Sequence, residues 1–155
     1  MLTKTTLSAI RALVHMAGQD QAAIHSPRQI AEVLHESPTY LAKTTRLLVK
    51  AGLLRAAKGA KGGVRLAMPP SRIGLLAVVE SCQGTIVGDY CQAGCPPGST
   101  CAFHDAALQL QESIVRVLSR WTIAQLAEKP FSATRRRAGL PCVMAPERQV
   151  LLWPR

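Results

Sequence analysis

The sequence lacks any apolar run long enough to cross a membrane. A spanning helix needs about 20 mostly apolar residues, whereas the longest apolar stretches here are short, as at residues 75–79. The N-terminus also lacks the charged end and uninterrupted apolar stretch of a secretory signal, because Lys4 and Arg11 fall inside an amphipathic pattern. We therefore expect a cytoplasmic protein that has no membrane partner.

Acidic residues are scarce, and the scarcity is uneven. The 155 residues include nine Asp and Glu against 19 Lys and Arg, which gives a net charge of +10. Residues 1–70 hold ten basic and three acidic residues. Residues 71–127 hold three basic and four acidic residues, and residues 128–155 hold six basic and two acidic residues. The N-terminal excess favours nucleic acid as a partner, because neutralised phosphates release counterions. An anionic membrane is the alternative, but the basic residues do not follow one isolated amphipathic helix.

The cysteines lack the even number of a disulfide framework. There are five, of which four lie between Cys82 and Cys101 and one, Cys142, stands apart. In a cytosolic chain such clustering indicates a metal or redox site. Cys82 lies on the apolar side of an expected helix, where a buried core thiol is the usual role.

Local signals predict a mainly α fold with a small β-hairpin. Apolar spacing places helices at residues 5–17 and 73–82. Ser26-Pro27 and Ser37-Pro38 each pair an N-cap with an N1 proline, so two short helices follow each other closely, the second ending at Gly52. Residues 53–57 can pair with 64–67 across a glycine-rich turn. Residues 1–84 therefore form a winged helix-turn-helix DNA-binding domain, in which the hairpin is the wing.

The rest of the chain divides into three segments. Residues 85–104 form a cysteine-rich loop, residues 105–127 a long dimerisation helix, and residues 128–155 an irregular tail. Apolar residues recur on the helix in steps of three and four, which predicts a homodimer seam. Its members are Leu110, Ile114, Val117, Leu118 and Trp121, and Leu126 is expected to widen it.

Several strings in this order resemble the Rrf2 family of bacterial transcriptional regulators, of the IscR/NsrR type. They are Ile30-Ala31-Glu32, Tyr40-Leu41, the run from Leu48 to Leu53, the wing from Gly59 to Ala67, and the turn from Glu80 to Gly84. The resemblance covers residues 2–127 and implies a homodimer bound to a near-palindromic operator of double-stranded DNA, with a repressor as the favoured role. Where the family usually has an aromatic residue after the wing glycines, this chain has Val64.

Basic and hydroxyl side chains are the candidate DNA contacts. Tyr40 and Thr39 are expected on phosphate, and Lys43, Thr44 or Arg46 at base edges. The full candidate set is Ser26, Arg28, Thr39, Tyr40, Lys43, Thr44, Arg46, Lys58, Lys61 and Arg65. The alternative for these cations is a merely solvated surface.

Cys91, Cys95, Cys101 and His104 form a candidate ligand set. Three thiolates and an imidazole suit a soft or borderline metal. The resemblance implies an iron-sulfur cluster, 2Fe-2S before 4Fe-4S, with His104 or His15 of the partner subunit as fourth ligand. The gap from Cys91 to Cys95 is shorter than the family's usual spacing, so zinc, a thiol switch without iron, and a vestigial loop that holds no metal stay open as alternatives.

Two other function classes are weighed against a regulator. An enzyme would use Cys101 as nucleophile and His104 as base, but the sequence marks no oxyanion hole and no orienting carboxylate beyond Asp105. We therefore expect no enzyme. A zinc-stapled module that binds RNA or protein is the more distant alternative.

Overall fold

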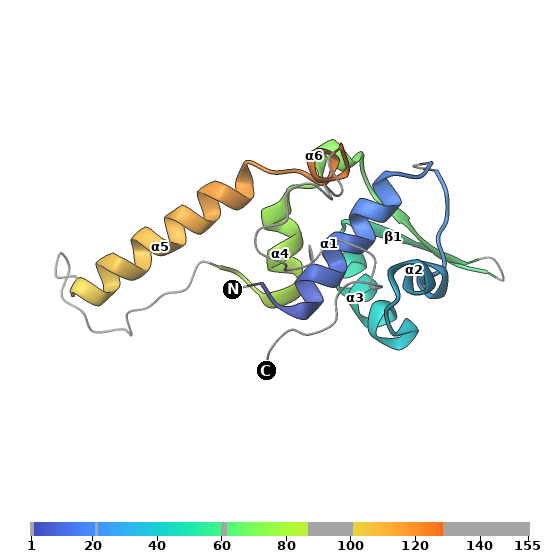
Figure 1. Ribbon diagram of the computed structural model, residues 1–155, viewed down its shortest axis with the longest axis horizontal. Coiled ribbons are helices and arrows are strands. Elements are labelled where there is room, and N and C mark those ends of the chain that lie inside the picture. Colours follow the sequence, from blue (N-terminus) through green and yellow to red (C-terminus); the bar gives the residue numbers. More distant parts are fainter. Residues whose placement is uncertain (1, 21, 60–61, 87–100, 129–155) are drawn as a thin grey trace, which may run out of the picture.

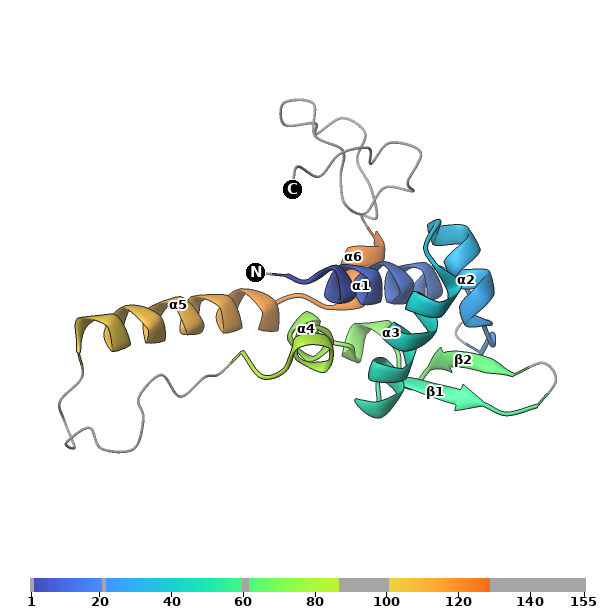
Figure 2. The ribbon, with the colours of Figure 1, turned by 90° about the horizontal axis from the view of Figure 1, so that it is seen from below.

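The computed structural model describes residues 2–20, 22–59, 62–86 and 101–128. Figure 1 shows a body of helices and a hairpin, from which the helix α5 (Ala102–Ser119) projects away. In Figure 2, α6 (Ile123–Glu128) lies above α1 (Lys4–Ala17), whereas α4 (Leu75–Gln83) and the hairpin lie below it. The predicted fold class, mainly α with a small β-hairpin wing, is confirmed.

Helix α1 is the centre of the core. It packs against α3, α4 and α6, and Leu13 and Met16 are essentially fully buried. The helix begins where the Thr3 side chain accepts a hydrogen bond from the Thr6 amide, which replaces an intrahelical partner that the first turn lacks. It ends at Gly18, as the sequence predicts.

The helix-turn-helix consists of α2 (Pro27–Leu34) and α3 (Pro38–Lys50). The predicted capping box is present, because Ser26 and Gln29 each bond to the backbone of the other. Ser37 occupies the N-cap position of α3, but its side chain makes no capping bond. Between the helices, His35 adopts a left-handed conformation with φ of 53°, which closes the turn within three residues.

The wing is the antiparallel pair β1 (Leu54–Ala57) and β2 (Gly63–Leu66). Its base is attached to the body, since His25 and Val64 exchange two backbone hydrogen bonds of 2.8 and 2.9 Å. Glycine is required at Gly63 for space, because a Cβ there would lie 2.4 Å from the His25 carbonyl oxygen. Gly59 supplies the positive φ, 113°, on the outer turn.

The prediction of a single helix over residues 105–127 is wrong, because this segment forms two helices. Helix α5 begins at Ala102 with Cys101 as N-cap, and α6 follows after a break. At the break, the Trp121 carbonyl accepts from Leu75 and the Ile123 amide donates to Ile73. These bonds, together with the β-bridge between Gly74 and Thr122, replace helical ones, and α4 starts at Leu75 instead of the predicted residue 73.

The break changes what the second half of the predicted helix does. Ile123 is fully buried and Leu126 packs against the core, so Leu126 belongs to the body instead of the seam. None of the 18 residues of α5 is buried. Most of the predicted cysteine loop, residues 87–100, and the tail from residue 129 lie outside the described residues. In the described parts of the chain, no helix is long and apolar enough to span a membrane.

Candidate nucleic-acid interface and cysteine site

One face of α3 carries a stripe of exposed polar and basic residues. Thr39, Lys43, Arg46 and Lys50 follow each other at steps of four, three and four and are all exposed, whereas Leu41 and its neighbours on the opposite face are buried. Steps of three and four keep side chains on one side of a helix. Lys50 was not among the predicted contacts, although its spacing of seven from Lys43 could have found it.

The structure corrects the prediction for Thr44. This residue is fully buried, and its hydroxyl donates to the Tyr40 carbonyl, one turn back on α3, at 3.1 Å. Thr44 therefore does not face a base edge. Tyr40 is half-buried, and its hydroxyl donates to the Thr5 hydroxyl of α1 at 3.1 Å, so its hydrogen atom is directed into the protein and not toward a phosphate.

The hairpin presents a second group of cations. Arg55 and Arg65 are directly opposite each other in the register of the two strands, and both are exposed, as is Lys58. Like charges in such positions repel, so an anion between them would be stabilising. Arg55 was not predicted, because its place opposite Arg65 follows only from the register. Lys61 lies outside the described residues.

A groove of about 390 Å³ separates the basic stripe from the hairpin. It is lined by Pro27, Ala42, Thr45, Arg46, Val49, Lys50, Ala56 and Val64. Ser26 and Arg28 flank Pro27 at its edge. The Ser26 hydroxyl caps α2 by accepting from the Arg28 amide, and the Arg28 guanidinium forms an exposed ion pair with Glu32 at 3.2 Å.

No carboxylate interrupts this region in the sequence. Between Glu36 and Glu80 the chain contains eight Lys and Arg residues and no Asp or Glu. The helix stripe and the hairpin both fall in this interval, so their positive charges are not neutralised by neighbours along the chain. Such a surface attracts a polyanion over several ångströms.

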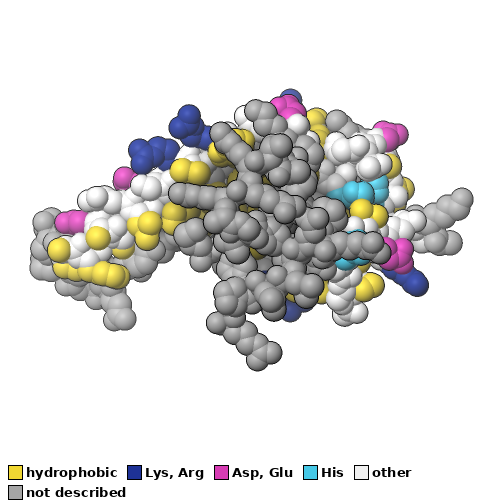
Figure 3. All heavy atoms as spheres, viewed as in Figure 1, with side chains coloured by type: hydrophobic (Ala, Val, Ile, Leu, Met, Phe, Trp, Pro, Cys, Tyr) yellow, Lys and Arg dark blue, Asp and Glu magenta, His cyan; other side chains and the backbone are white. Residues whose placement is uncertain are grey.

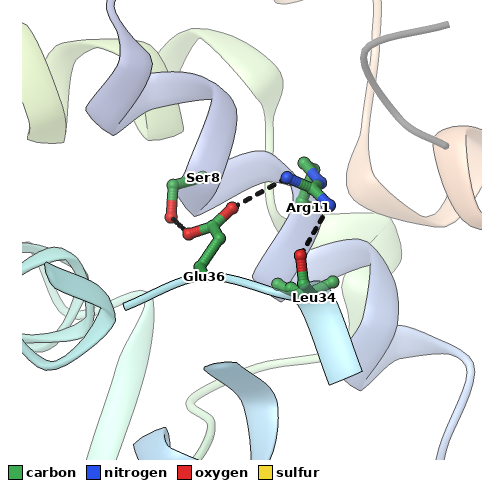
Figure 4. A network of polar contacts seen from close by, with 4 residues as sticks. All are labelled: Ser8, Arg11, Leu34 and Glu36. Carbon is green, nitrogen blue, oxygen red and sulfur yellow. Dashed lines mark hydrogen bonds and ion pairs between the residues drawn. The ribbon is translucent and has the colours of Figure 1, made fainter. Parts of the chain in front are cut away.

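Glu36, which precedes the basic interval, is held inside a polar network (Figure 4). It pairs with Arg11 of α1 at 2.9 Å and accepts from the Ser8 hydroxyl, while Arg11 also donates to the Leu34 carbonyl at 2.9 Å. Both charged side chains are only 10% exposed. The network attaches the turn of the helix-turn-helix to α1. Sequence reasoning missed it, because the two charges are 25 residues apart.

Only part of the predicted metal site is described. Cys101 is exposed at the N-cap of α5, and its sulfur accepts from the His104 amide at 3.4 Å. Cys91 and Cys95 lie outside the described residues. Within the described residues no group of three or more His, Cys, Asp or Glu could hold a metal. Of the four predicted ligands, only Cys101 and His104 are described, and the bond between them is to the His104 backbone amide.

Among the residues that the structure describes, Cys82 and His15 are the groups with a clearly shifted pKa. Burial raises the pKa of the Cys82 thiol, with a smaller opposing effect from its hydrogen bond with Ser81. Cys82 packs against the core, as predicted for a structural thiol. Burial, and then the charge of His25, lower the pKa of His15, whose ring lies edge-on to the His25 ring with centroids 6.2 Å apart.

Helix α5 presents an exposed apolar face in the part of the chain that the structure describes. Figure 3 shows hydrophobic side chains gathered along it, and Leu110, Val117 and Trp121 are 63%, 55% and 46% exposed. An apolar cavity of about 370 Å³ lies between α5, α4 and the N-terminus, lined by Leu2, Val79, Gln83, Ile86, Ser113, Ile114, Val117 and Leu118. Three of the five predicted seam residues, Ile114, Val117 and Leu118, thus line one cavity.

Comparison with known proteins gives a consistent picture. Residues 2–129 match the family model Rrf2, described as an iron-dependent transcriptional regulator. Among curated proteins, the chain is 32% identical over 131 residues to Protein aau3 of Rhizobium meliloti, covering 82% of this chain and 84% of that protein. It is 30% identical over 129 residues to the HTH-type transcriptional regulator NsrR of Halalkalibacterium halodurans, covering 81% and 88%.

Solved structures share the fold. IscR of T. potens superposes with a TM-score of 0.68 and 22% identity, covering 88% of this chain and 93% of that one. The global cysteine regulator CymR of B. subtilis gives a TM-score of 0.67 and 20% identity, with 83% and 96% covered. In both comparisons at least a tenth of this chain stays unmatched.

Proposed function

This chain belongs to the Rrf2 family of transcriptional regulators, and from this premise we propose that it is a homodimeric repressor that binds a near-palindromic operator. The observation that carries the proposal is the basic surface of α3 and the hairpin, which stands in an interval of the chain without carboxylates. The family membership confirms the prediction of a regulator and makes the enzyme reading of Cys101 and His104 unnecessary.

The exposed stripe of α3 suits the major groove. Lys43, Arg46 and Lys50 are long donors on one helix face, and Arg or Lys pairs with the O6 and N7 acceptors of guanine. Thr39, on the first turn, is placed to donate to a phosphate, where backbone amides at the helix N-terminus also favour an anion. In this proposal Tyr40 and Thr44 support the helix and do not touch DNA.

The wing and the start of α2 are proposed to hold the DNA backbone. Arg55, Lys58 and Arg65 are exposed on the hairpin, and Lys61 is one of the cations in its turn by sequence. Ser26 and Arg28, at the edge of the groove, complete the phosphate contacts. Contacts of this kind set position and affinity, while the α3 stripe sets sequence preference.

The second copy is proposed to cover α5. A helix of 18 residues without a buried one does not stay folded through its own propensity alone, since helical stability in proteins comes mainly from packing. The seam residues Leu110, Ile114, Val117 and Leu118 with Trp121 would bury against their counterparts, because isolated apolar patches of this kind mark interaction surfaces. Two copies would then present two α3 helices to successive half-sites.

The loop is proposed to hold an iron-sulfur cluster through Cys91, Cys95, Cys101 and His104. The described donors fit such a group, because Cys101 offers an exposed sulfur that already accepts an amide hydrogen bond, as cluster sulfurs do. A bound cluster would supply the loop with redox chemistry. Zinc, or a thiol pair without metal, is the alternative, since the same donors suit either.

The DNA-binding proposal is tested by salt dependence. The full chain is titrated against a duplex selected from a random library by the wild-type protein, at several salt concentrations. Lys58→Ala and Arg65→Ala are each expected to weaken binding and to reduce the slope of log K against log salt by about 0.9 per lost phosphate contact. Arg72→Ala, on the 3-10 turn at Pro70–Arg72, serves as the matched cation away from the groove. Equal slopes for all variants would refute the phosphate role.

The cofactor proposal needs a separate measurement. Protein purified without oxygen is examined by visible absorption and assayed for iron, sulfide and zinc. Iron and sulfide that disappear in Cys95→Ala support the cluster. Zinc, or no metal at all, rejects it and leaves the DNA-binding proposal unaffected.

A further inference from the structure

Two consecutive residues on the first turns of α1 connect different parts of the molecule. The Thr5 hydroxyl accepts from the Tyr40 hydroxyl of α3 at 3.1 Å. The Thr6 hydroxyl donates to the Gln83 side-chain oxygen at the end of α4, at 3.0 Å. Two adjacent residues of α1 therefore hold the end of α4 and the start of α3, which is the recognition helix in the proposed function.

The attachment to Gln83 is built from more than one bond. Its oxygen also accepts from the Thr3 backbone amide at 3.3 Å, and the hydroxyls of Thr3 and Thr6 lie 2.9 Å apart. Thr6 is fully buried, so its hydroxyl depends on partners inside the protein, and losing them costs the desolvation of a buried polar group. Gln83 is the last residue of α4, and only Gly84 separates it from the predicted cysteine loop.

The attachment to α3 is equally local. Tyr40 stands on the first turn of α3, and the Thr44 hydroxyl bonds to its carbonyl oxygen. One turn further along α1, Ser8 and then Arg11 hold Glu36 just before α3 begins (Figure 4). Side chains of α1 thus contact both the first turn of α3 and the turn that precedes it.

We infer that Gln83 is a positioning residue for the recognition helix, acting through Thr6, Thr5 and Tyr40. This inference rests on the proposed function, in which α3 reads DNA. Gln83 keeps the first turns of α1 in place, and these turns keep Tyr40 in place. A change in the cysteine loop that moves Gln83 would then displace the start of α3. Hydrogen-bond networks can carry coupling between distant sites, and the bonds from Gln83 to Thr6 and from Tyr40 to Thr5 form such a network.

The test removes or keeps the acceptor at residue 83. Gln83→Leu has no acceptor, whereas Gln83→Glu retains one, and Thr6→Val and Thr6→Ser form the same pair on α1. Ser81→Ala is the matched control on α4, because the Ser81 hydroxyl bonds only within its own helix and to the adjacent Cys82 among the contacts described. The full chain is labelled with 3-fluorotyrosine, and the Tyr40 resonance is assigned with Tyr40→Phe. Duplex affinity is measured on the selected duplex.

Gln83→Leu and Thr6→Val are expected to move the Tyr40 fluorine resonance and to weaken duplex binding roughly fivefold or more, the lower end of typical coupling between sites. Gln83→Glu, Thr6→Ser and Ser81→Ala should stay close to wild type in both. In a Tyr40→Phe background, Gln83→Leu should cause little further loss of duplex affinity, because the hydrogen bond between Tyr40 and Thr5 is already absent.

Two results would overturn the inference. One is a Tyr40 resonance that does not move in Gln83→Leu. The other is an affinity loss in Gln83→Leu that is the same factor with and without the Tyr40 hydroxyl, which would indicate general destabilisation. If wild type itself binds no duplex, the proposed function fails, and the fluorine signal alone still decides whether Gln83 positions Tyr40.

Discussion

Replacing Glu36 by leucine should be one of the most damaging single changes at a polar position of this protein. The substitution leaves the Arg11 guanidinium buried without its carboxylate, since both side chains are only 10% exposed. Removing one partner of a buried ion pair costs about 3–5 kcal/mol, because a buried charge is then uncompensated. Ser8 would also lose the carboxylate that accepts its hydroxyl.

The size of this loss makes it easy to measure. Domains of this kind have a total stability of about 5–15 kcal/mol, so Glu36→Leu removes a large part of it. With a urea slope of about 1.5 kcal/mol per molar, a loss of about 4 kcal/mol lowers the unfolding midpoint by about 2.7 M. Helical circular dichroism is followed in urea at pH 7, with all variants at one protomer concentration because association affects apparent stability.

The double variant and an exposed pair provide the controls. Arg11→Met with Glu36→Leu replaces both charges by apolar groups and should recover most of the loss, as buried pairs often allow. Arg28→Ala with Glu32→Ala removes an ion pair whose side chains are 80% and 62% exposed, and should change stability by less than about 1 kcal/mol. The reasoning is refuted if Glu36→Leu costs no more than the exposed pair, or if the double variant is as unstable as Glu36→Leu.

Three further predictions concern the seam, the histidine pair and the wing. Leu110→Asp should dissociate the proposed dimer in sedimentation velocity, because it places a charge in an apolar contact, while Gln109→Asp on the same helix should not; a dimer in both variants would move the interface elsewhere. The pKa of His15 is lower in the folded protein than the ordinary value of 6.5, so as the pH falls the unfolded chain takes up a proton at His15 before the folded protein does. The contribution of His15 to folding stability is therefore complete above pH 6.5 and is lost as the pH falls below that value. His15→Gln should therefore flatten the fall in stability between about pH 7 and pH 5, and an unchanged pH profile would contradict this. Gly63→Ala should cost about 1–3 kcal/mol because its Cβ would meet the His25 carbonyl at 2.4 Å, whereas Gly74→Ala meets nothing within 4 Å; thermal unfolding of the two variants decides it.

Much of the fold follows from signals that lie close together in the sequence. The capping box of Ser26 and Gln29, the proline after each N-cap serine, and the glycines of the wing act on neighbouring backbone. The helices and the hairpin could therefore be predicted within a few residues. The order of these elements also sufficed for the resemblance to the Rrf2 family, which the match over residues 2–129 confirms.

Other features depend on contacts between distant segments. The break after α5 exists because Trp121 and Ile123 bond to Leu75 and Ile73, at the start of α4 and just before it, although the apolar spacing continues through the break. Thr44 and Arg46 both looked like outward polar residues, yet only the packing of α3 on the body shows that Thr44 is buried.

By itself, the sequence determined which local elements form and where positive charge is concentrated, because caps, turns, periodicity and charge are properties of neighbouring residues. Only the tertiary structure decided that Arg55 opposes Arg65, that Arg11 meets Glu36, and that α1 joins Tyr40 to Gln83. Each of these pairings depends on how strands align or helices pack. The type of a residue alone does not indicate which distant residue it will contact.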